Sequence, residues 1–259
     1  MSIQLELDGP IARITLARPE ALNAFTYQAY GELADAVIQA NAAPRVSVIV
    51  IKGTGRAFST GGDLKQINDA FLANDRQRIA EVTQLFATNS LRAFTSLESS
   101  PKTIVGAING TCEAGGVGLL LCTDLSVAVR SAVFRVPEGL VGLADPFIPA
   151  RLPARVGIAA AKRLLLTAER IDADSALEMG LVNEVCEAED FDRRVEELVA
   201  DLLEISPATR HLYKRVVNVA QLPFDADIML RGNMGADAQE GVAAFAARKK
   251  PDWPSARSS

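Results

Sequence analysis

The pattern of apolar and polar residues changes character near residue 158 of this 259-residue chain. Before that point, short apolar runs typical of strands alternate with stretches of helical periodicity. Beyond it, the periodic stretches are almost all helical. This order predicts an α/β core followed by a helical part. We place the division within residues 190–206 and expect two units, 1–195 and 196–259.

The predicted strands are of two kinds. The first two alternate apolar with polar residues around a turn, which predicts a hairpin, whereas the next two are apolar nearly throughout, as in strands buried on both faces. In chain order the predicted strands are Ile3–Leu7, Ile11–Leu16, Val46–Ile51, Thr103–Ile108, Leu125–Val129 and Val133–Val136.

Apolar residues recur every three or four positions in the predicted helices, which gives each helix one buried face. In the first of them that face comprises Tyr30, Leu33, Ala34, Val37 and Ile38. A short apolar run, Leu119–Cys122, predicts a buried helix and is far too short to span a bilayer. The longer predicted helices are Tyr27–Ala40, Ile79–Leu97, Ala159–Leu166, Ala173–Glu178, Phe191–Ile205, Ala208–Val219 and Met234–Arg248.

Each of the two fully apolar strands leads into a glycine-rich turn, Phe58–Asp63 and Ala107–Gly116, and each turn is predicted to open a helix. Glycine lets a backbone N–H group approach a ligand closely, and the first N–H groups of a helix are unpaired and partly positive. The pair of turns therefore resembles a two-donor oxyanion hole. A dinucleotide-binding fingerprint does not fit, because Leu121 and Phe58 stand where its third glycine belongs.

The composition of the chain excludes several classes of function. The net charge of −5 is unsuited to neutralising phosphates, so we expect no nucleic-acid partner. Three scattered cysteines, with no Cys-x-x-Cys spacing, provide neither a disulfide framework nor a zinc site. The first residues have neither a leader pattern nor an apolar span, so we expect a cytoplasmic protein with no membrane contact.

Acid–base chemistry must rely on groups other than imidazole, because the chain has a single histidine, His211. That scarcity disfavours a Ser-His-Asp hydrolase. Cys112 lies within the second glycine turn, but a cysteine nucleophile needs a nearby base, so we expect it to be a small buried apolar residue.

The motifs of this chain, taken in order, resemble those of the crotonase superfamily, which includes the enoyl-CoA hydratases and isomerases. Each motif is short, and their common register along the chain makes the resemblance specific. The motifs are Ile14–Pro19, Ala21–Ala24, Gly55–Leu64, Ala107–Gly110, Pro137–Glu138, Leu152–Gly157, Ala176–Val182 and Glu240–Phe245.

The resemblance implies an α/β fold, a spiral of β-β-α repeats with a C-terminal helical trimerisation region. It also implies an acyl-CoA thioester as substrate, no separate cofactor or metal, and self-association as a homotrimer or hexamer. By position, the oxyanion donors would be the amides of Gly62 and Gly115. The CoA-binding and substrate-binding positions would be Arg18, Ala21, Ser59, Thr60, Gly61, Gly62, Asp63, Gly115, Lys249 and Lys250.

Hydratases of the superfamily use two glutamates, of which the later corresponds to Glu138. The earlier lies twenty residues upstream, at position 118, where this chain has glycine. Addition of water requires both a base and an acid within hydrogen-bond reach, whereas one carboxylate can move a proton between two carbons. The substitution shifts the expected reaction from hydration to double-bond isomerisation.

Two other acids are candidates for an auxiliary role. Asp145 stands near a position where some dienoyl-CoA isomerases carry an aspartate, but Pro146 after it also suits an N-cap. Glu113 precedes Gly115 by two residues and would face either the pocket or a subunit contact.

The leading hypothesis is an isomerase that stabilises a thioester enolate and uses Glu138 as its single carboxylate. The alternatives are a hydratase-like enzyme with a different second acid and a non-catalytic acyl-CoA binding protein. The sequence leaves the acyl chain and the pathway open.

Overall fold

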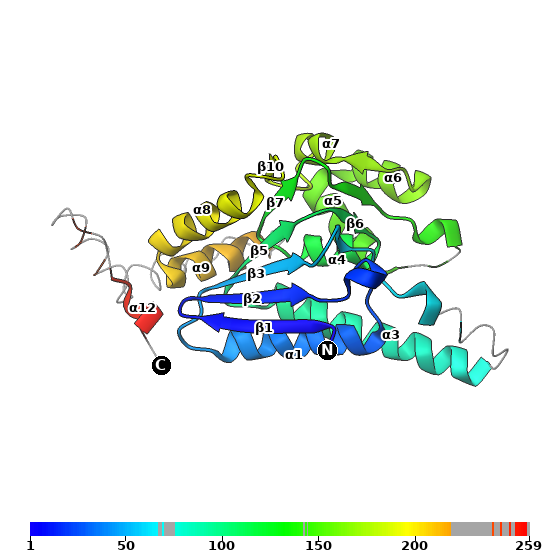
Figure 1. The fold of residues 1–259 in the computed structure, drawn as a ribbon, viewed down its shortest axis with the longest axis horizontal. Helices are drawn as coiled ribbons and strands as arrows, with labels where there is room; N and C mark the ends of the chain where they lie inside the picture. Colours follow the sequence, from blue (N-terminus) through cyan, green and yellow to red (C-terminus); the bar gives the residue numbers. More distant parts are fainter. Residues whose placement is uncertain are drawn as a thin grey trace.

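A computed structural model describes residues 1–66, 69, 76–141, 143, 145–218, 240, 244, 249 and 252–257. Two sheets and the helices packed on them make up this part of the protein (Figure 1). The helical elements are η1 (Pro19–Ala21), α1 (Tyr27–Ala42), α3 (Arg76–Glu98), α4 (Gly115–Leu121), η2 (Glu138–Val141), α5 (Phe147–Val156), α6 (Ile158–Thr167), α7 (Ala173–Glu178), α8 (Phe191–Glu204), α9 (Pro207–Asn218) and α12 (Pro254–Arg257).

The larger sheet has the strand order β1-β2-β3-β5-β7-β10. The first pair is an antiparallel hairpin, as predicted, and every later pair is parallel. The parallel strands β3 and β5 are buried along almost their whole length, which explains their nearly continuous apolar sequences. The bounds are β1 (Ile3–Asp8), β2 (Ile11–Leu16), β3 (Val48–Gly53), β5 (Thr103–Ile108), β7 (Leu125–Val129) and β10 (Glu184–Cys186).

The smaller sheet consists of β4 (Ala57–Ser59), β6 (Thr111–Glu113), β8 (Val133–Arg135) and β9 (Ile171–Asp172). Each of its first three strands follows a strand of the larger sheet directly, and the chain then enters a helix. The order β3-β4-α3, β5-β6-α4, β7-β8-α5 is therefore a β-β-α spiral, which confirms the predicted fold. Because β4, β6 and β8 pair in parallel, successive turns of the spiral are stacked side by side.

Helices α1 and α3 lie against each other beside β1 and β2 (Figure 1). Helix α8 packs on the large sheet over β3 and β7. The alternation along β2 reflects this layering, since Arg13 pairs with Glu196 of α8 at 2.8 Å while the next residue, Ile14, is 1% exposed.

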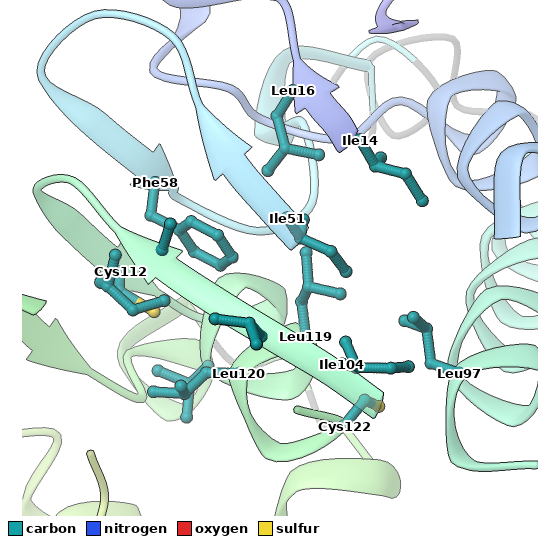
Figure 2. Close-up of a cluster of buried hydrophobic side chains, with 14 of the residues drawn as sticks. Ile14, Leu16, Ile51, Phe58, Leu97, Ile104, Cys112, Leu119, Leu120 and Cys122 are labelled. Atoms are coloured by element: carbon teal, nitrogen blue, oxygen red, sulfur yellow. The ribbon is translucent and has the colours of Figure 1, made fainter. Parts of the chain in front are cut away.

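The core lies between the two sheets and around α4. Ile51 of the large sheet, Phe58 of the small sheet and Leu119 of α4 are fully buried and belong to one cluster (Figure 2). The same cluster contains Cys112 and Cys122, both free and buried, as expected for Cys112. Through Phe58 and Leu119, the first glycine turn and α4 are therefore both fixed to this core cluster.

Several sequence-based expectations differ from the structure. Ile38 was expected on the buried face of α1, yet it is 44% exposed, because at 100° per residue it falls beyond the edge of the face centred on Leu33 and Val37. The short strands β4, β6, β9 and β10 were not predicted, since two or three residues carry too little periodicity. The predicted helix Met234–Arg248 lies almost wholly outside the described residues.

Among the described residues, no helix combines the length and apolarity needed to cross a membrane. The predicted division at residue 195 falls inside α8, and the role assigned to residues 196–259 stays a prediction.

Candidate active site

The two glycine turns meet in space although 54 positions separate Gly61 from Gly115. A Cβ atom placed on Gly61 would lie 2.4 Å from the Gly115 nitrogen, and Gly61 has φ +80°, a region that suits glycine. From the other side, a Cβ atom on Gly115 would lie 3.3 Å from the Gly61 Cα atom. Side chains at these positions would push the turns apart, so their contact depends on glycine.

The amides of Gly62 and Gly115 are free at this contact. Gly62 forms a bridge with Phe25 in which the neighbouring Gly61 carbonyl and Asp63 amide make the hydrogen bonds. Gly115 is the first residue of α4, so its N–H has no partner within the helix. Neither amide donates to any residue that the structure describes, and both residues line one cavity. The arrangement suits two donors to a single oxygen atom.

Glu138 lies in the wall of the same cavity. It begins η2, directly after Pro137, and so follows β8 of the small sheet. Its Oε2 atom is buried and has no hydrogen-bond partner among the described residues. A carboxylate oxygen that is withdrawn from water and unpaired is available to a substrate.

The environment of Glu138 favours its protonated form. Burial, together with the nearby charges of Asp145 and Glu113, raises the pKa of Glu138 from 4.5 to about 7, with a partly opposing contribution from its own backbone amide. A carboxyl group with a pKa near neutrality can act as either a base or an acid at physiological pH.

Asp145 and Glu113 also line the cavity, but each already has a partner. The Asp145 Oδ1 atom accepts hydrogen bonds from the amides of Phe147 at 2.8 Å and Ile148 at 2.7 Å, so it caps α5 as the N-cap interpretation predicted. Glu113 pairs with Arg170 at 3.3 Å. Both acids therefore influence Glu138 through their charge while their own oxygens are partly engaged.

An aromatic ring packs against Gly118, the position where the family resemblance places the second glutamate of hydratases. A Cβ atom on Gly118 would lie 3.0 Å from Cζ of Phe94 and 3.7 Å from Cγ1 of Ile148. The Phe94 ring packs on Phe147 with 4.5 Å between centroids, and both rings line the cavity. The Phe94 ring thus fills the space that a side chain at position 118 would enter.

Comparison with known proteins identifies the family to which this fold belongs. A model of the family described as "Enoyl-CoA hydratase/isomerase" matches residues 6–256. The chain belongs to this family. It is 30% identical to the crotonyl-CoA hydratase of Syntrophomonas wolfei, over 97% of both chains, and 32% identical to the peroxisomal Delta(3,5)-Delta(2,4)-dienoyl-CoA isomerase of Arabidopsis thaliana, over 71% of this chain and 68% of that one.

Among solved structures, an enoyl-CoA hydratase/carnithine racemase from Magnetospirillum magneticum is similar with a TM-score of 0.89 and 27% identity. The match covers 98% of this chain and 96% of that one. The resemblance to the crotonase superfamily is confirmed, and the protein is an enzyme of the enoyl-CoA hydratase/isomerase family. Because both hydratases and isomerases are among its relatives, the family alone leaves the reaction open.

Several of the positions that the family resemblance assigned to CoA lie at or beside the first glycine turn. Arg18 and Asp63 form an ion pair at 3.0 Å, and the Asp63 carboxylate also accepts from the amide of Lys65 at 3.1 Å. Ser59 is fully buried and donates to the Asn23 carbonyl at 2.9 Å, so its hydroxyl is committed within the protein.

The other predicted CoA positions differ in their access to the cavity. Thr60 lines it, whereas Ala21 is at the end of η1 and does not. Lys249 is exposed and its amide donates to the Ala244 carbonyl at 2.9 Å, away from the cavity lining. Lys250 lies outside the described residues.

The cavity of this family member has a volume of about 720 Å³ and is mainly apolar. Phe86, Phe94 and Phe147 line it, together with Val82 and Leu91 of α3. Such a lining suits an aliphatic or aromatic acyl group. The remaining nucleophile and base candidates lie elsewhere: Cys112 is in the core, and neither it nor His211 lines this cavity.

Sequence reasoning overlooked Tyr30 as a residue of the site. It was treated as one of the apolar positions of α1, whereas its hydroxyl reaches the cavity next to Gly115. The available signal was a polar atom at the centre of a buried helical face, which normally requires a partner.

Proposed function

We propose that this enzyme moves a carbon–carbon double bond in an enoyl-CoA thioester, converting a 3-enoyl into a 2-enoyl group with one carboxylate. The observation that carries the proposal is the unpartnered, buried Oε2 atom of Glu138 in a cavity where Phe94 takes the place of a second glutamate. The free amides of Gly62 and Gly115 in the same cavity support it.

In the proposed reaction, the thioester oxygen accepts hydrogen bonds from the Gly62 and Gly115 amides. The Glu138 carboxylate removes a proton from the α-carbon, and the negative charge passes into a dienolate whose oxygen is held by the two amides. Glu138, now protonated, returns the proton to the γ-carbon, which leaves the double bond conjugated with the thioester. One such donor contributes roughly 3 kcal/mol to lowering the barrier.

The pKa of Glu138 suits both halves of this cycle. A pKa of about 7 means that the carboxyl group takes a proton and releases it at neutral pH without a large free-energy penalty in either direction. We expect kcat/KM to rise with pH through about 7 and to level off above it, because the free enzyme needs the carboxylate form.

Incubation with a 3-enoyl-CoA and, separately, with a 2-enoyl-CoA tests the proposal. Isomerisation increases the absorbance of the conjugated thioester in the first incubation, whereas hydration decreases it in the second. We expect the first change to be fast and the second slow. Rapid hydration without measurable isomerisation would refute the proposal.

Two variants separate the roles of the carboxylates. Glu138→Gln should abolish isomerisation while acyl-CoA binding persists, because the amide keeps the shape and loses the base. Glu113→Gln is the matched control, since Glu113 lines the same cavity but pairs with Arg170 at 3.3 Å. Retained activity in Glu138→Gln, or its loss only in Glu113→Gln, would contradict a mechanism centred on Glu138.

A hydratase-like reaction is the second candidate, and the position of Glu113 favours it. Glu113 precedes Gly115 in the chain and lines the same cavity. Its carboxylate could hold a water if the ion pair with Arg170 opened. The 2-enoyl-CoA incubation described above measures this directly. Hydration that disappears in Glu113→Gln would establish it.

Self-association as a homotrimer or hexamer is part of the proposal, as is a cytoplasmic location. The exposed apolar residues of α9 support association, because Tyr213 is 64% and Val217 70% exposed. Light scattering after size exclusion should give a molar mass of a trimer or hexamer of the 27.6 kDa chain, and Val217→Glu should reduce that mass. A wild-type protein that is monomeric at micromolar concentration would refute this part.

A further inference from the structure

The ring of Tyr30 is held firmly in place by its neighbours. It is stacked on Phe25 with 4.5 Å between ring centroids and meets Phe94 edge to face at 5.8 Å. The residue is only 4% exposed. The position of its hydroxyl is therefore fixed by aromatic packing, which a phenylalanine at the same position would retain.

The hydroxyl lies where a side chain of Gly115 would be. A Cβ atom built on Gly115 would be 2.2 Å from the Tyr30 hydroxyl oxygen. Gly115 opens α4, and in helical backbone, with φ near about −60°, the Cα–Cβ and N–H bonds point to the same side of the N–Cα bond. The Tyr30 hydroxyl therefore sits on the side toward which the free Gly115 amide is directed.

No described residue forms a hydrogen bond with this hydroxyl, although Tyr30 lines the cavity. The hydroxyl oxygen is not fully buried and opens to the cavity, where a ligand can pair with it. Burial, and the nearby charges of Asp145 and Glu138, raise the pKa of Tyr30 far above its ordinary value. The phenol thus stays neutral and keeps its proton available for donation to a ligand.

We propose that the Tyr30 hydroxyl is a third donor to the thioester oxygen, beside the amides of Gly62 and Gly115. The proposal rests on the proposed function of this cavity as an oxyanion site. Aromatic packing holds the hydroxyl oxygen in position before the substrate arrives, so the donor atom need not move as charge develops on the thioester oxygen. A third donor also stabilises the enolate that a lone carboxylate must generate.

Acetoacetyl-CoA is a suitable probe, because its enolate has its own ultraviolet absorption band and forms without turnover. Bound to the wild-type protein, it should ionise at lower pH than it does free in solution. Tyr30→Phe should raise the pH midpoint of the bound enolate by about one unit, a tenfold loss of enolate stabilisation. With a 3-enoyl-CoA, the same variant should lower kcat about 10- to 100-fold and change KM little.

Tyr27→Phe is the matched control. Tyr27 lies on the same helix and also meets an aromatic ring, that of Phe86, at 5.9 Å, but it does not line the cavity. Its hydroxyl should be dispensable for both readouts. If Tyr30→Phe did not fold, a fluorotyrosine incorporated at position 30 would replace it, and the more acidic phenol should lower the enolate midpoint.

The outcomes distinguish this inference from the proposed function. An unchanged enolate midpoint in Tyr30→Phe would overturn the third donor. A change confined to the pH dependence of kcat would also overturn it, because the hydroxyl would then act on Glu138 and not on the thioester oxygen. Wild-type protein that lowers the enolate midpoint but isomerises nothing would refute the isomerase while leaving the donor intact. If acetoacetyl-CoA formed no enolate on the wild-type protein, both the donor and the oxyanion site would be wrong.

Discussion

Replacing Glu138 by glutamine should stabilise the folded protein, and the gain should grow with pH. The pKa of Glu138 rises from 4.5 to about 7 on folding, so the folded state holds its proton more tightly than the unfolded state does. Stability from this group is complete below pH 4.5 and is lost as the pH rises through about 7. At about 1.4 kcal/mol per pH unit, the full loss is about 3 kcal/mol, which solvent screening at this partly exposed carboxyl reduces to about 1–2 kcal/mol.

Denaturant titrations at pH 5.5 and pH 8.5 test this reasoning. We expect Glu138→Gln to exceed the wild type by about 1–2 kcal/mol at pH 8.5, equivalent to about 2–6 °C in Tm, and by less than half as much at pH 5.5. Glu189→Gln is the control, because the same change is made there at an exposed carboxylate. A Glu138→Gln variant no more stable than wild type at pH 8.5 would show that the carboxylate is not strained by burial.

Substitutions at three further positions probe the packing around the site. Gly118→Ala should cost about 1–2 kcal/mol in denaturant titrations, since its Cβ atom would lie 3.0 Å from Phe94, and an unchanged stability would mean that the ring moves freely. Gly61→Ala should cost about 3 kcal/mol or more and weaken acyl-CoA binding measured by calorimetry, because φ is +80° and the new Cβ atom would lie 2.4 Å from the Gly115 nitrogen; wild-type binding would contradict the close contact. Asp145→Ala should lower stability by about 1 kcal/mol and Asp145→Asn by less, whereas an inactive but fully stable Asp145→Asn would assign the carboxylate to the chemistry rather than to the cap.

Much of the architecture was predictable because long strands and helices carry periodic patterns. The hairpin, the buried strands β3 and β5, and helices such as α7 were predicted within a few residues of their bounds. The second sheet was predicted only at β8, because β4 and β6 have three residues each at the glycine turns and β9 has only two. Their pairing arises from the spiral and leaves no local trace in the sequence.

The chemistry of the site was only partly predictable. Glu138 and the two glycines were found from motif order, and the structure brings them to one cavity. No sequence pattern indicated that Phe94 covers Gly118 or that Tyr30 reaches Gly115, since residues of α3 and α1 meet the second turn only through tertiary packing. Contacts between side chains far apart in the chain depend on exact placement, which residue type and spacing do not determine.

The contact between Gly61 and Gly115 has a consequence for how the enzyme acquires activity. The amides of Gly62 and Gly115 belong to successive β-β-α coils of the spiral, β3-β4-α3 and β5-β6-α4. Neither coil alone therefore forms a site that binds an oxygen from two sides. Closing a loop of this length requires long-range order, which arrives late in folding. Under the proposed mechanism, activity is therefore a property of the docked coils, and any insertion that displaces one coil against the other separates the two proposed donors even if every helix and strand survives.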